Sequence, residues 1–380
     1  DEMSPGDIVG RVGGDEFVVV SSNLTDRRLA TRFAERVLTA VAAPVQIVHQ
    51  VIEPSVSIGI ALRGASSDPQ VLLANADLAL YKAKDSGRCC ARVFDQSLRL
   101  AADERVGIET GLRRAVGQDD ISVEYQPRVD LRTGQVTSLE ALARWNARPD
   151  IPVWRFIEVA EHSGIVDQLG RNVLNRACRD IVRINQTAGG APVGVSVNVS
   201  MRQLMQPDLV GTVADALHTH GVPHDLLTLE ITETFVAQEP ELAASTLADI
   251  RGLGVRIEID DFGVGHTSFT SLSSMSIDGI KIDRSLVLGL AHDEATESIV
   301  AAIVAMARAL RLQTTVEGIE SADDLGVLRA LGCDLGQGYL FSRSVPFETA
   351  QRLVATWPGL CPAAAAMVAD DRVPARLPGR

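Results

Sequence analysis

Seven short strand-like segments, each delivering a polar residue near its end, alternate with helical sequence between about residues 105 and 356. The segments are SLEALAR, VSVNVS, LTLEIT, IEIDDFG, IKID, TVEGIE and LGQGY. Repeated strand–helix alternation over ~250 residues is typical in pattern and size of a (β/α)8 TIM-like barrel. The polar residues that the segments deliver are Glu140, Asn198, Glu230, Asp260, Asp261, Lys281, Glu317 and Gln337. Such strands point to one common centre, so we expect these side chains to converge there.

The segments are aliphatic on one face and polar on the other. In VSVNVS, for example, Val195 and Val197 oppose Ser196 and Asn198, because strand side chains alternate between faces. In a barrel the aliphatic face packs on the helices, so the polar face points inward. Burying acids there costs several kcal/mol per ion, unless other charges offset them.

One amine faces five acids in this polar set. Alternatively, these acids could form ordinary salt bridges or lie at solvated loop ends. However, a set with one amine and five acids leaves few cations for salt bridges. A pair of divalent cations would supply the charge and would suit phosphodiester hydrolysis. Because the ligand set is rich in oxygen and lacks histidine, it favours two Mg²⁺ or Mn²⁺ ions and disfavours zinc.

The chain is acidic, with 36 Lys and Arg against 49 Asp and Glu and a net charge of −13. This charge argues against broad binding of duplex nucleic acid or of an anionic membrane surface. Five scattered cysteines favour a reducing, cytoplasmic location. No apolar run approaches the ~20 residues of a membrane span, so we expect no membrane contact within this chain. A membrane or sensory segment of a longer parent would lie upstream.

Four regions follow from these patterns. Residues 1–95 read as strand, helix, strand, strand and helix, and begin with a hairpin around Gly13 and Gly14. Residues 96–107 form a helical connector, and residues 108–356 form the barrel. Residues 357–380, rich in Ala, Pro and Arg, are expected to be a disordered tail.

Residues 108–356 resemble an EAL domain, the phosphodiesterase module of cyclic di-GMP signalling. The namesake Glu140-Ala141-Leu142 stands in SLEALARW, after EYQPRVDL and before VNVS, LEITE, DDFGVGHTS, KIDRS, VEGIE and GQGYLFS. The resemblance implies hydrolysis of cyclic di-GMP to linear 5′-pGpG and a homodimer formed through this domain. The alternatives are a catalytically inactive cyclic di-GMP receptor and, for a full-length parent, a bifunctional cyclase–phosphodiesterase.

The resemblance also implies roles for individual residues. The first metal ion would be bound by Glu140, Asn198, Glu230 and Asp260, and the second by Asp260 and Asp261. Lys281 would hold or polarise the attacking water and, with Glu317 and Glu140, act in catalysis. Glu233 would anchor the loop after Asp261. Substrate contacts would come from Gln126, Leu142, Arg144, Asp283, Glu320 and Gln337.

Residues 1–95 resemble the second half of a GGDEF domain, the diguanylate cyclase module. The evidence is RVGGDEFVVV, SVSIGIAL and ADLALYKAKDSGR. The resemblance implies a vestigial cyclase site made of Gly13, Gly14, Asp15, Glu16, Lys84 and Arg88. The first half of that family's sheet is absent from this chain, so we expect no cyclase activity from it.

Four residues depart from the EAL pattern. Glu258 lies one inward step below Asp260 and either pairs with Lys281 or a hydroxyl, or adds negative charge beneath the metals. Arg128 replaces an aliphatic residue and either extends to solvent or contacts ligand. Val264 and His266 lie in the loop after Asp261, as tolerated variation or, for His266, as a pH-sensitive element.

Overall fold

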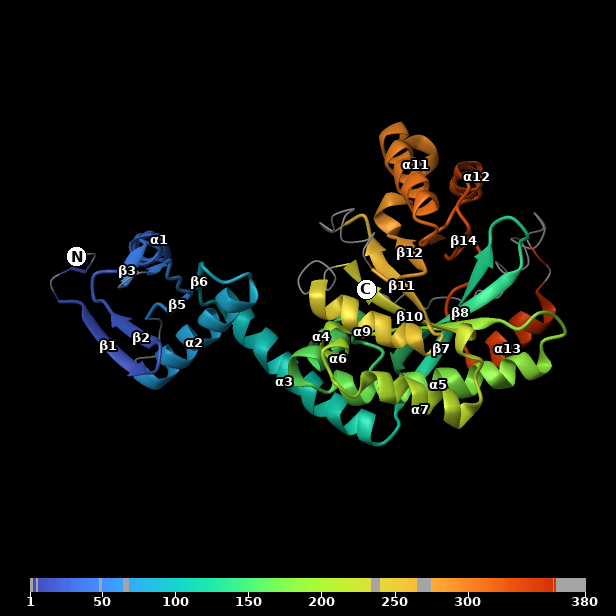
Figure 1. Cartoon of the computed structure of the whole chain (residues 1–380). Helices are drawn as coiled ribbons and strands as arrows, with labels where there is room; N and C mark the ends of the chain where they lie inside the picture. Colours follow the sequence, from blue (N-terminus) through green and yellow to red (C-terminus); the bar gives the residue numbers. More distant parts are fainter. Residues whose placement is uncertain are drawn as a thin grey trace, which may run out of the picture. The chain divides into compact units, whose positions relative to one another are not determined.

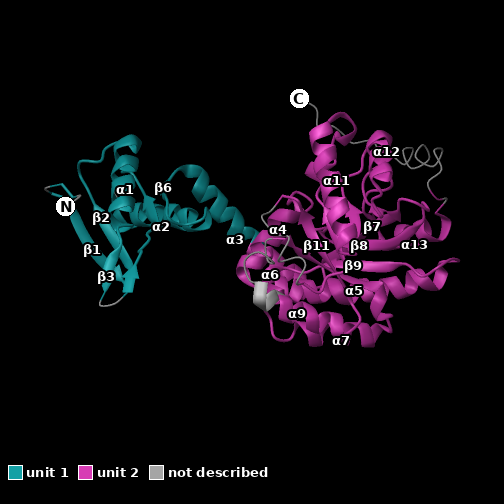
Figure 2. Ribbon diagram, turned by 45° about the horizontal axis from the view of Figure 1, so that its top comes forward, with its two compact units in different colours: residues 1–108 teal, residues 109–380 magenta. Residues whose placement is uncertain are grey.

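The computed structural model describes residues 3–4, 6–47, 50–63, 68–233, 240–264, 275–357 and 359. The chain divides into two compact units, Asp1–Ile108 and Glu109–Arg380, which Figure 2 shows in teal and magenta. His266 and residues 360–380 of the expected tail lie outside the described residues.

The first unit begins with the predicted hairpin. Strands β1 (Ile8–Gly13) and β2 (Glu16–Val20) pair antiparallel, and the turn uses Gly14 at a φ of 43°. Helix α1 (Arg27–Val41) follows, and the Asp26 side chain caps it by accepting a hydrogen bond from Leu29 N at 2.9 Å. The expected hairpin is therefore confirmed.

The rest of this unit contains two separate two-stranded sheets, one antiparallel and one parallel, and a second helix that packs on the parallel one. Its elements are β3 (Val45–Ile47), β4 (Gln50–Ile52), β5 (Ile58–Ile60), α2 (Pro69–Asp85) and β6 (Ala91–Val93). At Gly59 in β5 an added Cβ would lie 2.1 Å from Ala76 O, so only glycine lets α2 approach the strand so closely. Phe17 on the hairpin is 64% exposed, which fits a partial sheet.

Helix α3 (Gln96–Gly117) crosses the boundary between the two units. It covers the expected connector, residues 96–107, and continues to Gly117. Ile108 and Leu112 are spaced one helical turn apart, and both are buried.

The second unit is a closed barrel, which confirms the predicted TIM-like fold (Figure 1). All seven predicted segments lie on strands or at their ends, and each strand bonds to its neighbour in sequence order before β14 pairs with β7. The strands are β7 (Ile121–Asp130), β8 (Val136–Trp145), β9 (Gly194–Asn198), β10 (Leu227–Thr232), β11 (Arg256–Phe262), β12 (Gly279–Ile282), β13 (Gln313–Val316) and β14 (Leu335–Gly336).

Strand β7 differs from its neighbours because it runs antiparallel to both β8 and β14. A tight turn joins β7 to β8: the Asp130 carboxylate accepts from Arg132 N and Thr133 N, and Gly134 has a φ of 78°. Such a short link permits only an antiparallel pair, since a parallel crossover needs a dozen or more residues. The short strand β15 (Val345–Pro346) adds to the outer part of β7.

Helices cover the outside of the barrel (Figure 1). In the longest of them, α5, the buried Val173, Ala177 and Ile181 recur at helical spacing. Trp357, at the end of the last helix, donates a hydrogen bond from Nε1 to Gly134 O at 2.8 Å. The helices are α4 (Val153–Ser163), α5 (Val166–Thr187), α6 (Met201–Leu204), α7 (Leu209–His220), α9 (Pro240–Gly252), α11 (Glu294–Ala309), α12 (Ala322–Leu331) and α13 (Phe347–Thr356), with 3-10 turns η1 (His224–Leu226), η2 (Arg284–Leu286) and η3 (Leu290–His292).

In the part of the chain that the structure describes, no helix has both the length and the apolar character that crossing a bilayer requires.

Candidate active site

The register of the barrel strands brings the predicted polar residues onto one inward face. Glu230 on β10 stands beside Asn198 on β9, and on its other side it stands beside Glu258 on β11. Glu140 on β8 stands beside Ser196, one inward step below Asn198. The alternation read from the sequence therefore gives the side of each strand that faces the barrel interior.

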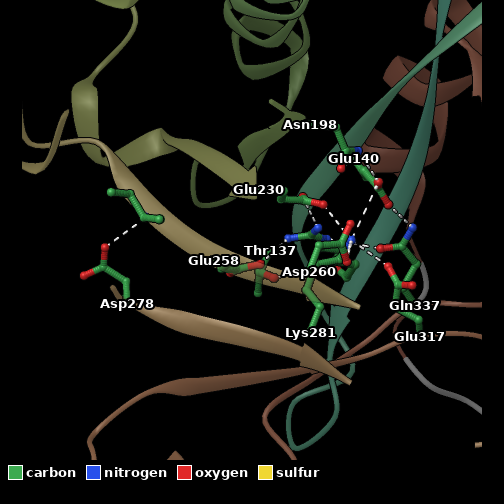
Figure 3. A network of polar contacts seen from close by, with 12 residues as sticks. Thr137, Glu140, Asn198, Glu230, Glu258, Asp260, Asp278, Lys281, Glu317 and Gln337 are labelled. Carbon is green, nitrogen blue, oxygen red and sulfur yellow. Dashed lines mark hydrogen bonds and ion pairs between the residues drawn. The ribbon is translucent and has the colours of Figure 1, made fainter. Parts of the chain in front are cut away.

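Lys281 on β12 lies at the centre of this face and is 1% exposed. Its Nζ lies 2.6 Å from Glu230, 2.9 Å from Asp260 and 2.6 Å from Glu317. Figure 3 shows these side chains close together. A fourth carboxylate, Glu140, is 3.7 Å away. Burial by itself lowers the pKa of Lys281, but the surrounding carboxylates outweigh it and raise that pKa well above its usual value.

Asp260 and Asp261 are consecutive, so a regular strand would point them to opposite faces. The pairing of β11 with β12 shifts between Ile259 and Phe262, and Asp261 has a left-handed φ of 56°. Aspartate tolerates this conformation better than most residues. As a result, carboxylate oxygens of Asp260, Asp261 and Glu317 all lie within 4.8 Å of one another.

Two amides hold Glu140. Asn198 Nδ2 donates to Glu140 Oε1 at 2.9 Å, and Gln337 Nε2 donates to Glu140 Oε2 at 2.6 Å. Gln337 Nε2 also contacts Gln126 Oε1 at 2.9 Å, and Gln126 Nε2 donates to Ser342 O at 3.0 Å. The predicted residues on β7, β8 and β9, together with Gln337 just after β14, thus form one hydrogen-bonded chain.

Arg128 lies beneath these acids and is the second buried cation of the site, after Lys281. It is 1% exposed, so it does not extend to solvent. Its guanidinium hydrogen-bonds to Glu230 and lies 2.8 Å from Glu258. Glu258 therefore pairs with Arg128 rather than with Lys281 or a hydroxyl, and Arg128 is a buried cationic partner that the polar set of strand ends did not include.

The surroundings of the cluster lower the pKa of one carboxyl group and raise the pKa of two others. Burial raises the pKa of Glu230, but Arg128 and Lys281 outweigh it and lower that pKa to about 2. Burial, together with Asp260 and Glu140, raises the pKa of Glu317 to about 7 despite the neighbouring Lys281. Burial and Asp260 also raise the pKa of Asp261. Glu317 is therefore a group that can exchange a proton near neutral pH.

The donor set fits a hard divalent cation. Asp260, Asp261 and Glu317 offer clustered carboxylate oxygens, and Asn198 adds an amide oxygen nearby. Six carboxylates in this region face two cations, Lys281 and Arg128, so negative charge remains in excess. Added positive charge would stabilise this arrangement.

Comparison with known proteins identifies the family of the barrel. The family model "EAL domain" matches residues 109–344, which is more than half of the chain. The chain belongs to the EAL family. A second model, "Diguanylate cyclase, GGDEF domain", matches residues 1–90.

Similar proteins share both domains over most of this chain. The cyclic di-GMP phosphodiesterase NbdA of Pseudomonas aeruginosa is 35% identical over 92% of this chain and 45% of its own length. The cyclic di-GMP phosphodiesterase PdeR of Escherichia coli is 35% identical over 91% of this chain and 52% of its own length. The chain spans about half the length of the curated relatives it matches.

Solved structures match the EAL unit. The PaMucR phosphodiesterase in complex with c-di-GMP is 34% identical, with a TM-score of 0.61, and covers 64% of this chain and 99% of its own. The EAL domain of Mycobacterium smegmatis DcpA is 34% identical, with a TM-score of 0.55, and covers 62% of this chain and 97% of its own.

Gln126 and Gln337 belong to the hydrogen-bonded chain around Glu140, and the other four predicted substrate residues lie outside it. Arg144 donates to Glu124 at 2.8 Å and to Ser344 Oγ at 2.7 Å. Asp283 caps η2 by accepting from Ser285 N at 2.8 Å, and Glu320 pairs with Arg284 at 2.7 Å. Leu142, on the same inward face as Glu140, is half-buried. The Arg144–Glu124 and Arg284–Glu320 ion pairs restrict the orientation of these charged side chains.

Two further predicted features have clear positions. Glu233 is buried and accepts a hydrogen bond from Gly263 N at 3.2 Å, at the start of the loop after Asp261. Val264 in that loop is 61% exposed. In the GGDEF unit the predicted cyclase residues are all exposed; they are Gly13, Gly14, Asp15, Glu16, Lys84 and Arg88.

Proposed function

We propose that this chain hydrolyses cyclic di-GMP to linear 5′-pGpG with two Mg²⁺ or Mn²⁺ ions at the carboxylate cluster. The observation that carries the proposal is the meeting of Asp260, Asp261 and Glu317 around Lys281 in an EAL domain. Relatives named cyclic di-GMP phosphodiesterases, and a similar structure in complex with c-di-GMP, support the substrate.

The metal ions would be held by Glu140, Asn198, Glu230, Asp260 and Asp261. When bound, such ions lower the pKa of water and stabilise charge on phosphoryl oxygens. Lys281 donates hydrogen bonds at the centre of the cluster and there orients the attacking water. Glu317, with a pKa of about 7, exchanges a proton at its carboxylate near neutral pH.

The substrate would lie over the mouth of the barrel. Gln126 and Gln337 offer amide groups next to Glu140. Arg144 supplies positive charge for a phosphate, and its bonds to Glu124 and Ser344 limit the directions in which it can point. Asp283 and Glu320 offer acceptors for the N–H groups of guanine, and Leu142 packs against the ligand.

Incubation of the purified chain with cyclic di-GMP tests this proposal. We expect 5′-pGpG, identified by liquid chromatography and mass spectrometry, with Mg²⁺ or Mn²⁺ and none with EDTA. Asp260→Asn abolishes measurable turnover, whereas Glu294→Gln, an exposed acid on α11, leaves it unchanged. Binding of cyclic di-GMP without turnover would refute hydrolysis and establish the receptor alternative.

Two further proposals concern the oligomeric state of the chain and the cellular location of the protein. The chain forms a homodimer through its EAL unit, which sedimentation velocity tests against a monomer of 40.6 kDa. The protein acts in the cytoplasm, where fractionation of cells that express the full-length parent would detect it. Residues 1–90 match a GGDEF domain, so the bifunctional cyclase–phosphodiesterase alternative applies to the full-length parent. GTP turnover by that parent tests it.

A further inference from the structure

A buried ion pair lies on the floor of the carboxylate cluster. Arg128 on β7 is 1% exposed and Glu258 on β11 is 5% exposed, and their side chains meet at 2.8 Å. Neither belongs to the residues proposed to bind metal or substrate. A buried pair of this kind is weak evidence for stability, because desolvation offsets much of the attraction. Its contacts point instead to a role in orientation.

The first contact of the pair fixes Glu230. Arg128 hydrogen-bonds to Oε1 of Glu230, while Lys281 donates to Oε2 at 2.6 Å. The two carboxylate oxygens are therefore held by two different cations on two different strands. Hydrogen bonds to both oxygens hold the Glu230 carboxylate in one orientation, which a single partner would not do.

The second contact fixes the amide of Gln337. Arg128 Nε donates to Gln337 Oε1 at 3.1 Å. Because a guanidinium only donates, the oxygen of Gln337 must face Arg128 and its nitrogen must face away. That nitrogen donates to Glu140 at 2.6 Å, so Arg128 also sets the direction from which Glu140 is held.

The barrel makes room for Glu258, and its charge balances that of Arg128. Gly279 on β12 stands in register beside Glu258, and a Cβ there would lie 3.1 Å from Glu258 Cγ and 2.9 Å from Gln313 O. The pair brings one positive and one negative charge into the floor. It therefore orients Glu230 without changing the net charge of the cluster above it.

We propose that Arg128 and Glu258 act together as a positioning pair that orients the Glu230 carboxylate and the Gln337 amide for divalent-metal binding. This inference rests on the proposed phosphodiesterase function. Glu258 holds the guanidinium in place, and the guanidinium holds two residues of the site. Partners that orient metal ligands contribute about 10–100-fold to metal affinity or activity in known sites.

Three variants separate orientation from charge and from packing. Arg128→Met combined with Glu258→Leu keeps the net charge and the approximate volume but removes the hydrogen bonds. Arg128→Lys keeps the charge but cannot reproduce the three-way fork. Tyr125→Phe is the matched control: it removes a buried hydrogen bond, Tyr125 Oη to Asp180 at 2.9 Å, from the same strand without touching the cluster.

The measurements are Mn²⁺ affinity by calorimetry, turnover of cyclic di-GMP, and thermal unfolding in EDTA. We expect the double variant to stay folded and to bind Mn²⁺ about 10–100-fold more weakly than the wild-type chain. Arg128→Lys binds Mn²⁺ at least about threefold more weakly, and its kcat falls more than its KM rises. Tyr125→Phe keeps wild-type Mn²⁺ affinity and turnover.

Wild-type Mn²⁺ affinity and kcat in both Arg128 variants would overturn the inference, because the pair would then contribute only packing beneath the site. If the double variant does not fold, Arg128→Lys alone decides, by the same affinity and kcat. A wild-type chain that binds Mn²⁺ but does not hydrolyse cyclic di-GMP refutes the proposed function, while the affinity pattern still supports the pair. A wild-type chain that binds no Mn²⁺ overturns both.

Discussion

Replacing Lys281 with methionine removes the cation at the centre of the carboxylate cluster. Lys281 is 1% exposed and has three carboxylate partners at 2.6–2.9 Å, on β10, β11 and at the end of β13. The side chains of these partners are at most 22% exposed, so water screens the uncovered charge poorly. Breaking a buried ion pair by deleting one partner typically costs about 3–5 kcal/mol. We expect a loss of that size in the free energy of unfolding at pH 8 in EDTA.

The loss shrinks as the pH falls. The pKa of Glu317 is about 7 even with Lys281 present, and removal of that cation raises it further. A carboxyl group with a raised pKa in the folded state binds more protons there than in the unfolded chain, so folding is favoured as the pH falls through that pKa. One pKa unit corresponds to ~1.4 kcal/mol, so we expect the penalty at pH 5.5 to be about 1–2 kcal/mol smaller than at pH 8.

Tryptophan fluorescence during urea unfolding measures this effect in the barrel alone. All three tryptophans, Trp145, Trp154 and Trp357, belong to the second unit. Lys82→Met, which removes a half-exposed cation from the first unit, serves as the control and leaves this transition unchanged. Equal stability of the Lys281→Met variant and the wild-type chain at pH 8, or a penalty that does not change with pH, would refute the electrostatic account.

Three further predictions follow from the site. The apparent Mn²⁺ affinity rises about tenfold from pH 6 to pH 8, because Glu317 has a pKa of about 7 and, once protonated, adds no negative charge beside a cation bound at Asp260 and Asp261. Calorimetry checks this, and an undiminished slope in Glu317→Gln contradicts it. Asp261 has a φ of 56°, so Asp261→Val lowers the free energy of unfolding in urea by about 1–3 kcal/mol. Asp261→Asn lowers it by less than about 0.5 kcal/mol but still weakens Mn²⁺ binding, and equal losses in the two variants would argue against backbone strain. Gly279→Ala costs about 1–3 kcal/mol because its Cβ would lie 3.1 Å from Glu258 Cγ, and a double-mutant cycle with Glu258→Ala should show a smaller cost; strict additivity would exclude that contact.

The period of two in the strand segments predicted the inward face because it depends only on local geometry. Asn198, Glu230, Glu258 and Lys281 all follow it, in strands whose opposite faces are aliphatic. The barrel itself was predictable for the same reason, since strand and helix patterns alternate along the chain. Local periodicity thus determines which side chains can meet.

Asp261 and Arg128 show where local reasoning fails. Alternation alone would point Asp261 away from Asp260, and only the irregular pairing of β11 with β12 brings both to Glu317. Arg128 has partners 102, 130 and 209 residues further along the chain. No sequence window reveals those contacts, because they depend on closure of the barrel. The antiparallel course of β7 is also absent from a simple repeat of strand and helix.

The closure of the ring by β7 has a consequence for the order in which this domain assembles. β7 can pair with β8 as soon as the tight turn between them is made. Its other edge pairs with β14, which is synthesised more than 200 residues later. Contacts so distant in sequence carry a high loop-closure entropy and form slowly. During synthesis, Arg128 therefore remains without Gln337, and β7 keeps an open edge, until almost the whole barrel has been made. We expect this open edge to be the part of the nascent barrel most in need of a chaperone.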